Sequence, residues 1–320
     1  MRRFVVPVLV AALAVTTLAG CSSSSSTPPT ACDSAAAGGA AIDLVNVTGD
    51  PAAVPELSAY TPIESPTTQW KTLTPGTGTE ITADNQTVVL DITLYSGKTG
   101  ERLAGTAYDG SLTRAQALSA WSKGFEGLAR SLTCAREGAR VATVIGPDGY
   151  DAEALSTLGL SGNDTLIAVT DVRKVYLAKA DGADQFVETP GLPAVVLAPD
   201  GRPGIIVPAG APPTTLQVAV LKKGTGEAIT DSEPVRLAYT GVVWSTGEVF
   251  DSSWDKGAAS FTLSQTVPGF QKALTGQTVG SQVLIVIPPD QGYGDKANSS
   301  IPAGSTLVFV VDILGVDATG

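Results

Sequence analysis

Apolar and polar positions along the chain follow the same order twice. In residues 75–101, and again in residues 223–248, Gly-Thr-Gly precedes Ile-Thr, an alternating apolar–polar run and a turn that ends in Thr-Gly-Glu. Alternation with a period of two predicts a strand buried on one face, and Thr-Gly between two such runs predicts a hairpin. The sequence therefore predicts an internal repeat whose copies each begin with a strand and a hairpin.

The likeness continues downstream of the hairpins. Lys123–Leu128 (KGFEGL) matches Pro268–Ala273 (PGFQKA), and both segments predict the start of a short helix. Two later apolar runs also recur: VATVIGPD at 141–148 as VLIVIPPD at 283–290, and TLIAV at 165–169 as TLVFV at 306–310. Each copy thus predicts strand, hairpin, strand, short helix, strand, loop and strand, which is an α+β pattern of antiparallel strands folded over one helix.

A Pro- and Gly-rich stretch at 189–213 separates the copies and predicts a boundary near residues 180–190. We expect one domain over residues 41–180 and a second over residues 188–320. Within the stretch, Ala194–Leu197 predicts an edge strand of the second domain.

The N-terminus is typical of an exported protein. Arg2 and Arg3 precede an apolar run, Phe4–Ala19, that is too short for a membrane span and predicts a signal peptide over residues 1–20. Leu-Ala-Gly-Cys at 18–21 resembles a bacterial lipobox, which implies cleavage before Cys21 and a lipid on its sulfur. Residues 21–40 predict a Ser-, Pro- and Ala-rich tether. An ordinary signal peptide, with Cys21 incidental, stays the alternative.

Composition narrows the function. The net charge is −11, which argues against nucleic acid and against electrostatic docking on anionic lipid, so membrane attachment would rest on the lipid alone. The chain has no histidine, which excludes Ser-His-Asp and Cys-His catalysis and His-ligated zinc; we expect no metal and no cofactor. Cys32 and Cys134 are a candidate disulfide in an oxidising compartment, with two free thiols as the alternative.

The second copy carries an ordered series of motifs. It runs through Tyr-Thr-Gly at 239–241, Gly-Glu-Val-Phe-Asp-Ser-Ser at 247–253, Val-Pro-Gly-Phe at 267–270, Ile-Pro-Pro-Asp at 287–290, Tyr-Gly at 293–294, Ile-Pro at 301–302 and Leu-Val-Phe at 307–309. Residues 215–316 thereby resemble the FKBP-type peptidyl-prolyl cis/trans isomerase family. The two-domain lipoprotein arrangement resembles actinobacterial members.

The resemblance implies two FKBP-like domains, each a twisted antiparallel β-sheet wrapped over a short α-helix, with an apolar pocket in between. It implies that the Ile301 backbone N–H holds a substrate carbonyl, that the Tyr293 hydroxyl bonds the peptide, and that Asp251 helps to polarise the cavity. The residues implied at the catalytic site, with Val267 as a substrate-binding residue, are Tyr239, Phe250, Asp251, Phe270, Tyr293, Ile301 and Phe309.

Several positions depart from the family pattern. Phe270 replaces the Trp usual at the pocket floor, Ala259 or Ser260 stands where a wall aromatic is expected, and Ala297 stands where some members have His. The first copy departs further: Ile92, Leu103, Ala104 and Ala168 align with Tyr239, Phe250, Asp251 and Phe309, while Phe125 keeps the floor aromatic, Tyr150 lies near the Tyr293 position and Leu160 falls opposite Ile301. We expect the first domain to be a degenerate, non-catalytic copy, with a divergent active pocket as the alternative.

The resemblance implies a monomeric, lipid-anchored prolyl isomerase on the outer face of the cell membrane, acting on proline-containing exported polypeptides. Macrolide immunosuppressant binding stays open. One alternative is a largely non-catalytic chaperone or adaptor lipoprotein that binds peptides through FKBP-like pockets; another is an envelope structural lipoprotein with a closed pocket.

Overall fold

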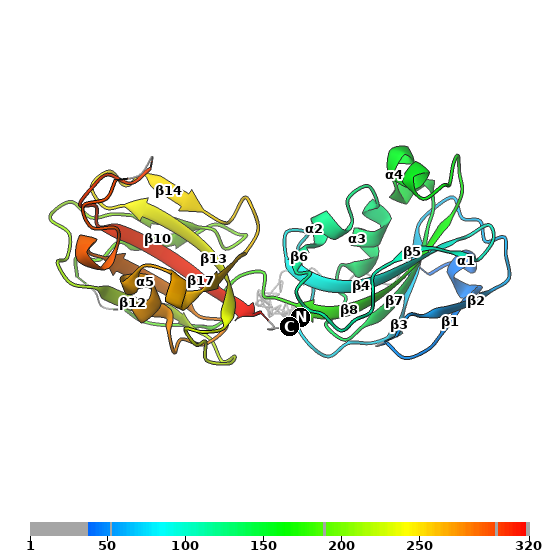
Figure 1. The fold of residues 1–320 in the computed structure, drawn as a ribbon, viewed down its shortest axis with the longest axis horizontal. Helices are drawn as coiled ribbons and strands as arrows, with labels where there is room; N and C mark the ends of the chain where they lie inside the picture. Colours follow the sequence, from blue (N-terminus) through cyan, green and yellow to red (C-terminus); the bar gives the residue numbers. More distant parts are fainter. Residues whose placement is uncertain (1–37, 52, 188–189, 298–299, 318–320) are drawn as a thin grey trace, which may run out of the picture.

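Two antiparallel sheets follow one another along the chain. The computed structural model describes residues 38–51, 53–187, 190–297 and 300–317. The strand order is β3-β7-β8-β4-β5 in the first sheet, where β6 also pairs with β4, and β14-β13-β17-β16-β12-β9 in the second, where β15 also pairs with β13. Figure 1 shows the sheets side by side along the long axis. We call residues 38–175 the first unit, residues 183–317 the second unit and residues 176–182 the connection.

The strands of the first unit are β1 (Val45–Thr48), β2 (Glu56–Ala59), β3 (Gln69–Thr74), β4 (Thr87–Ser96), β5 (Arg102–Gly105), β6 (Gln116–Ala117), β7 (Arg140–Ile145) and β8 (Leu166–Val175). Its helices are α1 (Ala40–Asp43), α2 (Leu118–Trp121), α3 (Glu126–Leu132) and α4 (Ala152–Thr157), with a 3₁₀ turn, η1 (Pro147–Gly149).

The strands of the second unit are β9 (Ala183–Asp184), β10 (Ala194–Leu197), β11 (Pro203–Ile206), β12 (Gln217–Lys223), β13 (Pro234–Val243), β14 (Val249–Ser252), β15 (Ala259–Thr262), β16 (Gln282–Ile287) and β17 (Leu307–Val316). It has one α-helix, α5 (Pro268–Leu274), and two 3₁₀ turns, η2 (Leu263–Gln265) and η3 (Pro289–Gln291), within the described ranges.

The order of elements predicted for each copy occurs in both units. The long strands β4 and β8 pair in the first sheet as β13 and β17 do in the second, and α3 and α5 occupy the same place in the order. Pro268 begins α5, where its missing N–H leaves no helical hydrogen bond unmade. The expected antiparallel α+β class is therefore confirmed. The domain limits stay a prediction, although β9 already pairs with β12 inside the predicted boundary interval.

One face of each sheet packs on its helix. The alternating apolar residues of β13, β16 and β17 form a buried cluster with Phe270, Ala273 and Leu274 of α5. The first unit builds the same kind of core with Leu128 and Leu132 of α3. Period-two alternation sends every second residue to the opposite face, so each sheet has a second apolar face that also needs cover.

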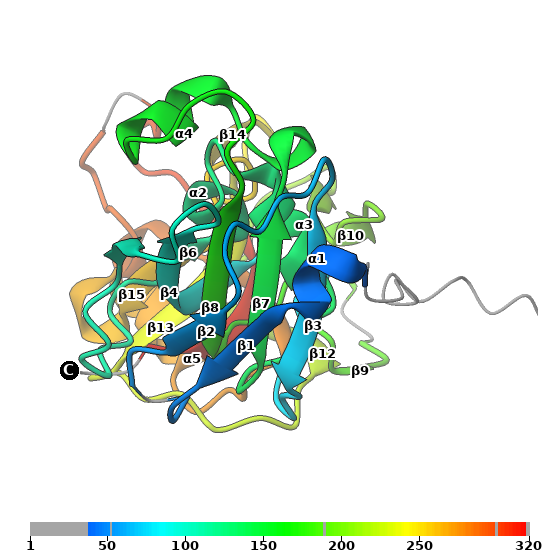
Figure 2. The same ribbon diagram turned by 90° about the vertical axis from the view of Figure 1, so that its right-hand side faces the viewer.

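Hairpins cover these opposite faces. In the first unit, β1 and β2 lie over the sheet with α1, as Figure 2 shows, and Ile42 and Val45 are buried against it. In the second unit, β10 pairs with β11 alone, and Val195 and Ile205 pack over the buried outer face of the sheet. The prediction that Ala194–Leu197 is an edge strand was therefore wrong: it belongs to a two-stranded layer that shields apolar side chains from water.

The predicted signal peptide, tether, Cys21 and Cys32 lie outside the described residues, so lipidation and the Cys32–Cys134 disulfide stay predictions. Cys134 is half-buried directly after α3. Within the described ranges, no helix is both long and apolar enough to cross a membrane.

Candidate active site

A cavity of about 420 Å³ lies in the second unit beside α5. Its walls come from both the sheet and the helix, so it lies where the inner face of the sheet is not fully covered. The lining residues are Tyr239 from β13, Phe250 and Asp251 from β14, Phe261 from β15, Gln265, Thr266 and Val267 from the turn before α5, Phe270 from α5, Tyr293 after η3, and Phe309 from β17.

Aromatic rings form most of the cavity wall, and they pack edge to face. The Phe309 ring is the centre: its centroid lies 5.2 Å from that of Phe270 and 5.4 Å from that of Phe250. The ring centroid of Phe261 lies 5.6 Å from that of Tyr239, and the two ring planes meet at 70°. Such contacts fix ring orientations and add stability beyond the buried area. The cavity is therefore a formed apolar site.

Gly241 makes room for two of these rings. It faces Phe309 across the β13–β17 ladder. A Cβ built on it would lie 2.6 Å from the Phe250 ring and 2.9 Å from the Phe309 ring, closer than carbon atoms can approach. Only glycine at this position leaves room for both rings beside the β13 backbone.

Asp251 gives the apolar cavity one negative charge. The Tyr239 hydroxyl donates a hydrogen bond to its carboxylate, and so do the Lys256 ammonium, at 3.3 Å, and the Ser252 backbone N–H, at 2.9 Å. Burial alone would raise the pKa of Asp251, but the hydrogen bonds from Tyr239 and Lys256 outweigh it and hold that pKa below its usual value. Burial and the adjacent carboxylate both raise the pKa of Tyr239. Asp251 is therefore ionised and Tyr239 is protonated at neutral pH.

All but one of the predicted site residues line this cavity. The exception is Ile301, which is 4% exposed and belongs to the buried cluster with Phe270 and Phe309. The roles predicted for all of them stay predictions. Ala259 or Ser260 was expected to leave the wall without an aromatic, but Phe261, further along β15, contributes a ring. The period-two alternation of β15 could have indicated Phe261, and Gln265 and Thr266 were also missed.

The first unit places other side chains at the corresponding positions. Leu94 faces Ala168 across β4 and β8, where the second unit has Gly241 facing Phe309, so the large and small residues have exchanged strands. The buried cluster here also takes in Leu103, Phe125, Tyr150 and Leu160, together with Trp121 and Leu158. Helix α4 packs closely against the segment before α3, because a Cβ on Gly124 would lie 2.6 Å from the Cβ of Ala154. That the first unit is a degenerate copy stays a prediction.

No cluster of metal-ligating side chains occurs among the described residues. The side chains that line the cavity include one carboxylate, two phenols, one amide and one aliphatic hydroxyl among apolar walls. These groups can hold and orient a peptide.

Comparison with known proteins finds FKBP-type sequences in each case. The family model for FKBP-type peptidyl-prolyl cis-trans isomerase matches residues 225–314, which include every residue that lines the cavity. A probable FK506-binding protein of Corynebacterium glutamicum is 36% identical over 114 residues, which is 35% of this chain and 97% of that protein. An FK506-binding protein of Streptomyces anulatus is 34% identical over 120 residues, which is 36% of this chain and 97% of that protein.

Among solved structures, FkpA from Escherichia coli matches with 30% identity and a TM-score of 0.32, over 42% of this chain and 55% of that chain.

Proposed function

This chain belongs to the FKBP-type peptidyl-prolyl cis-trans isomerase family, and we propose that catalysis takes place in the second unit, in the cavity around Tyr239, Asp251 and Phe309. The observation that carries the proposal is the aromatic enclosure of that cavity, in which Phe250, Phe261 and Phe270 surround a site with a single carboxylate.

The chemistry suits an apolar cavity. The prolyl amide is held planar by resonance with a barrier of about 18–20 kcal/mol, and its two isomers differ by only about 0.5–1 kcal/mol, so the difficulty is kinetic. The planar amide is charge-separated, whereas the twisted transition state has lost that resonance. Walls formed by rings such as Phe309 and Phe270 solvate the planar form poorly and so disfavour it relative to the twisted one. No nucleophile, acid, base or metal is needed.

The polar groups orient the peptide. Ionised Asp251 faces into the cavity and accepts a hydrogen bond from the Tyr239 hydroxyl, which fixes the phenol ring in the wall. Tyr293 is 43% exposed and stands at the rim, where its hydroxyl can reach a bound peptide. We expect proline to pack in the cavity against the Phe309 and Phe270 rings, with the preceding residue toward Asp251.

Turnover of a proline tetrapeptide by the purified full-length protein tests the activity. We expect acceleration over the uncatalysed rate, and none would rule the function out. Phe270→Leu and Phe125→Leu are matched variants, because the two phenylalanines hold corresponding positions of the repeat, at the N-terminal ends of α5 and α3. Loss of aromatic enclosure should lower kcat/KM about tenfold in Phe270→Leu. Phe125→Leu should keep wild-type turnover; a comparable loss there would contradict catalysis by the second unit alone.

We also propose that the protein is exported, lipid-anchored at Cys21 on the outer face of the membrane, and monomeric, and that it acts on proline-containing exported polypeptides. The lipobox-like Leu-Ala-Gly-Cys at 18–21 and the acidic charge support this. Labelling of expressing cells with a fatty-acid analogue should mark the wild type and not Cys21→Ser. Equal labelling of both would contradict the anchor.

The chaperone or adaptor alternative loses one of its motives, since Phe261 supplies a wall aromatic. A Tyr239→Ala variant separates the two functions. If it abolishes turnover yet still protects a client protein from aggregation, peptide binding is separable from catalysis.

A further inference from the structure

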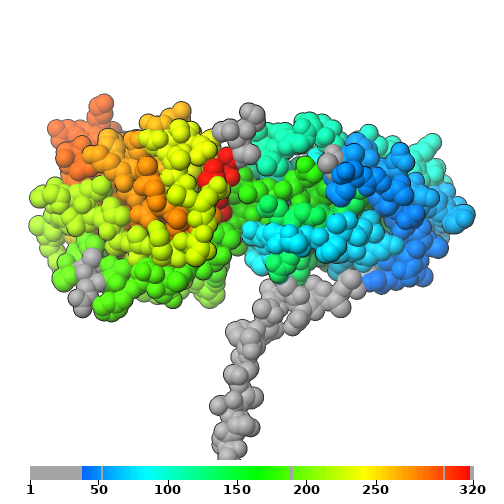
Figure 3. Space-filling view, turned by 90° about the horizontal axis from the view of Figure 1, so that it is seen from below, coloured from blue at the N-terminus to red at the C-terminus, as the bar shows by residue number. Residues whose placement is uncertain are grey.

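An aromatic residue beside the candidate site is buried against the first unit. Trp254 follows Asp251 by three residues and is 8% exposed. It belongs to an apolar cluster formed by both units and the connection, which meet in Figures 1 and 3. The cluster contains Val89, Tyr176, Ala238, Trp254 and Leu314, with Leu112, Ala115, Leu177 and Ala258 packed against it. Burial of Trp254 therefore depends on the first unit being in place.

Close packing on more than one side holds the Trp254 indole in this cluster. Only about 20 Å³ stays open in the cavity between it and the first-unit residues Asn85, Gln86 and Thr87. On another side, a Cβ on Gly201 would lie 3.2 Å from the far edge of the indole. Within the described ranges the buried Nε1 has no hydrogen-bond partner, although a buried indole N–H usually finds one. The residue is thus fixed by packing.

The loop that carries Trp254 is bonded to the cavity wall. The Trp254 N–H donates to the Ser252 hydroxyl at 3.3 Å. The residue between them, Ser253, makes two bonds to Tyr239: its N–H donates to the Tyr239 carbonyl at 3.0 Å, and its hydroxyl accepts the Tyr239 N–H at 2.9 Å. Any shift of the loop would therefore move the backbone of Tyr239.

The same loop supplies partners of the carboxylate. Ser252 donates its N–H to Asp251, and Lys256 places its ammonium 3.3 Å from the same oxygen. The Lys256 backbone N–H in turn donates to the Ser253 carbonyl at 2.9 Å. The loop at 252–258 therefore helps to set both the position and the charge state of Asp251.

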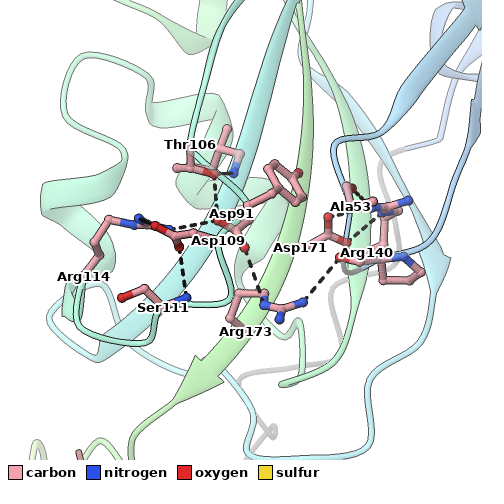
Figure 4. A network of polar contacts seen from close by, with 12 residues as sticks. Ala53, Asp91, Thr106, Asp109, Ser111, Arg114, Arg140, Asp171 and Arg173 are labelled. Atoms are coloured by element: carbon pink, nitrogen blue, oxygen red, sulfur yellow. Dashed lines mark hydrogen bonds and ion pairs between the residues drawn. The ribbon is translucent and has the colours of Figure 1, made fainter. Parts of the chain in front are cut away.

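The first-unit side of the contact is held by ion pairs. Leu112 and Ala115 lie in the loop between β5 and β6, which an ion network holds down (Figure 4). Arg114 of this loop pairs with Asp109 and, at 3.2 Å, with Asp91 of β4, whose side chain is 3% exposed. A loop fixed by a buried carboxylate is a firm support for the side chains packed against it.

We propose that Trp254 is a positioning residue through which the first unit holds the 252–258 loop, and with it Asp251 and Tyr239, in the geometry that prolyl isomerisation requires. The proposal rests on the function proposed for the second unit. The degenerate first unit then acts as an intramolecular support for the catalytic cavity of the second unit and binds no substrate of its own.

Kinetic measurements on full-length variants, with kcat and KM determined separately, test this role. Leu112→Asp places a charge in the cluster from the first-unit side, and Thr113→Asp places the same charge on the exposed neighbour. Trp254→Ala empties the contact from the other side. We expect Leu112→Asp and Trp254→Ala to lower kcat about tenfold with KM changed less than about twofold, since misplaced groups lose transition-state stabilisation. Thr113→Asp should match the wild type.

Rescue distinguishes positioning from mere stability. Because the indole Nε1 makes no hydrogen bond within the described ranges, Trp254→Phe keeps the apolar contact and should retain most of the wild-type kcat. Far-ultraviolet circular dichroism and urea unfolding identify the folded variants, and Leu112→Ala replaces Leu112→Asp if the latter does not fold. An inactive wild type overturns the proposed function itself. An active wild type with unchanged kcat in folded Trp254→Ala and Leu112 variants overturns only the role of Trp254.

Discussion

At the scale of single residues, the two units differ at one corresponding pair of residues on neighbouring strands. Gly241 and Phe309 face each other in the second sheet, and Leu94 and Ala168 face each other in the first. The two pairs fill similar space. Only the Gly241–Phe309 pair of the second unit places an aromatic ring, on β17, beside an open cavity. The absence of an aromatic at Ala168 was readable from the sequence. The compensating Leu94 was not, because register decides which residues face each other.

Gly241→Ala tests this pair. The added methyl would collide with the Phe250 and Phe309 rings, so we expect the free energy of unfolding to fall by about 1–3 kcal/mol and kcat/KM to fall with it. Urea unfolding and the peptide assay measure the two effects. Gly204→Ala is the matched control, because its Cβ would meet nothing nearer than 3.5 Å. Equal stability of the two variants would contradict the proposed steric role.

Cys134 shows a strained backbone where the second unit has glycine. It follows α3 with φ of 71°, and Gly276 follows α5 with φ of 84°. A Cβ is unfavourable in this left-handed region. In the reduced protein, Cys134→Gly should therefore raise the free energy of unfolding by up to about 1 kcal/mol, whereas Cys134→Ala should not. Chemical denaturation with a reductant present measures both; a Gly variant no more stable than the Ala variant would refute the prediction.

At the scale of elements, the repeated strands were predictable and the layers that cover them were not. Period-two alternation marks a strand and one apolar face, which is why β4, β13 and the start of α5 at Pro268 could be predicted. The hairpins β1–β2 and β10–β11 consist of short strands whose role depends on what they cover. The sequence offered no local signal that Ala194–Leu197 would leave the edge of the sheet and lie across its outer face.

Strand β17 carries a buried carboxylate, Asp312, which faces Gln282 of β16 where the first unit has an arginine. In the first unit, Arg140 forms a two-pronged ion pair with Asp171, with both N–O distances at 2.7 Å. At the matching positions, Gln282 donates to Asp312 at 2.7 Å, and the Ala180 N–H donates to it at 2.8 Å. Burial raises the pKa of Asp312 to about 6, against these two hydrogen bonds and the nearby charges of Lys222 and Lys179.

A raised pKa makes stability depend on pH. Folded protein holds the Asp312 proton up to about pH 6, whereas an unfolded aspartate releases it near 3.8, so the free energy of unfolding falls as pH rises between these values. The total from this group is about 3 kcal/mol. A cavity of about 140 Å³ beside Gln282 and Asp312 leaves room for a longer side chain.

Gln282→Arg would restore the ion pair of the first unit. We expect it to lower the Asp312 pKa and to remove most of the fall in stability between pH 4 and 6. Urea unfolding of wild type and variant over this range gives a difference curve in which other titrating groups cancel. Parallel curves would mean that Asp312 is not the group responsible.

At the scale of the whole molecule, the contact between the units was beyond sequence reasoning. Trp254 and Leu112 have no motif that pairs them, and they share one apolar cluster only because the two sheets meet at the connection. The cavity of the second unit was largely predictable because ordered aromatic motifs mark it, even though Phe261 was missed. The supporting role that we propose for the first unit could be inferred only from the packing around Trp254 in the structure.

Tyr176 lies at the centre of this junction. It is 1% exposed, its ring fills the space where a Cβ on Gly315 would stand, and the Arg236 guanidinium lies 5.3 Å from the ring centre. The Leu177 N–H next to it donates to the Leu314 carbonyl at 3.1 Å. A buried ring that touches both units should couple their unfolding.

Tyr176→Ala should therefore uncouple the units. We expect wild type to unfold in a single thermal transition. The variant should lose about 3–5 kcal/mol at the junction and unfold in two transitions, each closer to the intrinsic stability of one unit. Tyr176→Phe keeps the ring and should unfold as the wild type does. Differential scanning calorimetry distinguishes these outcomes, since a single transition in Tyr176→Ala would show that the other side chains of the shared apolar cluster are sufficient to couple the units.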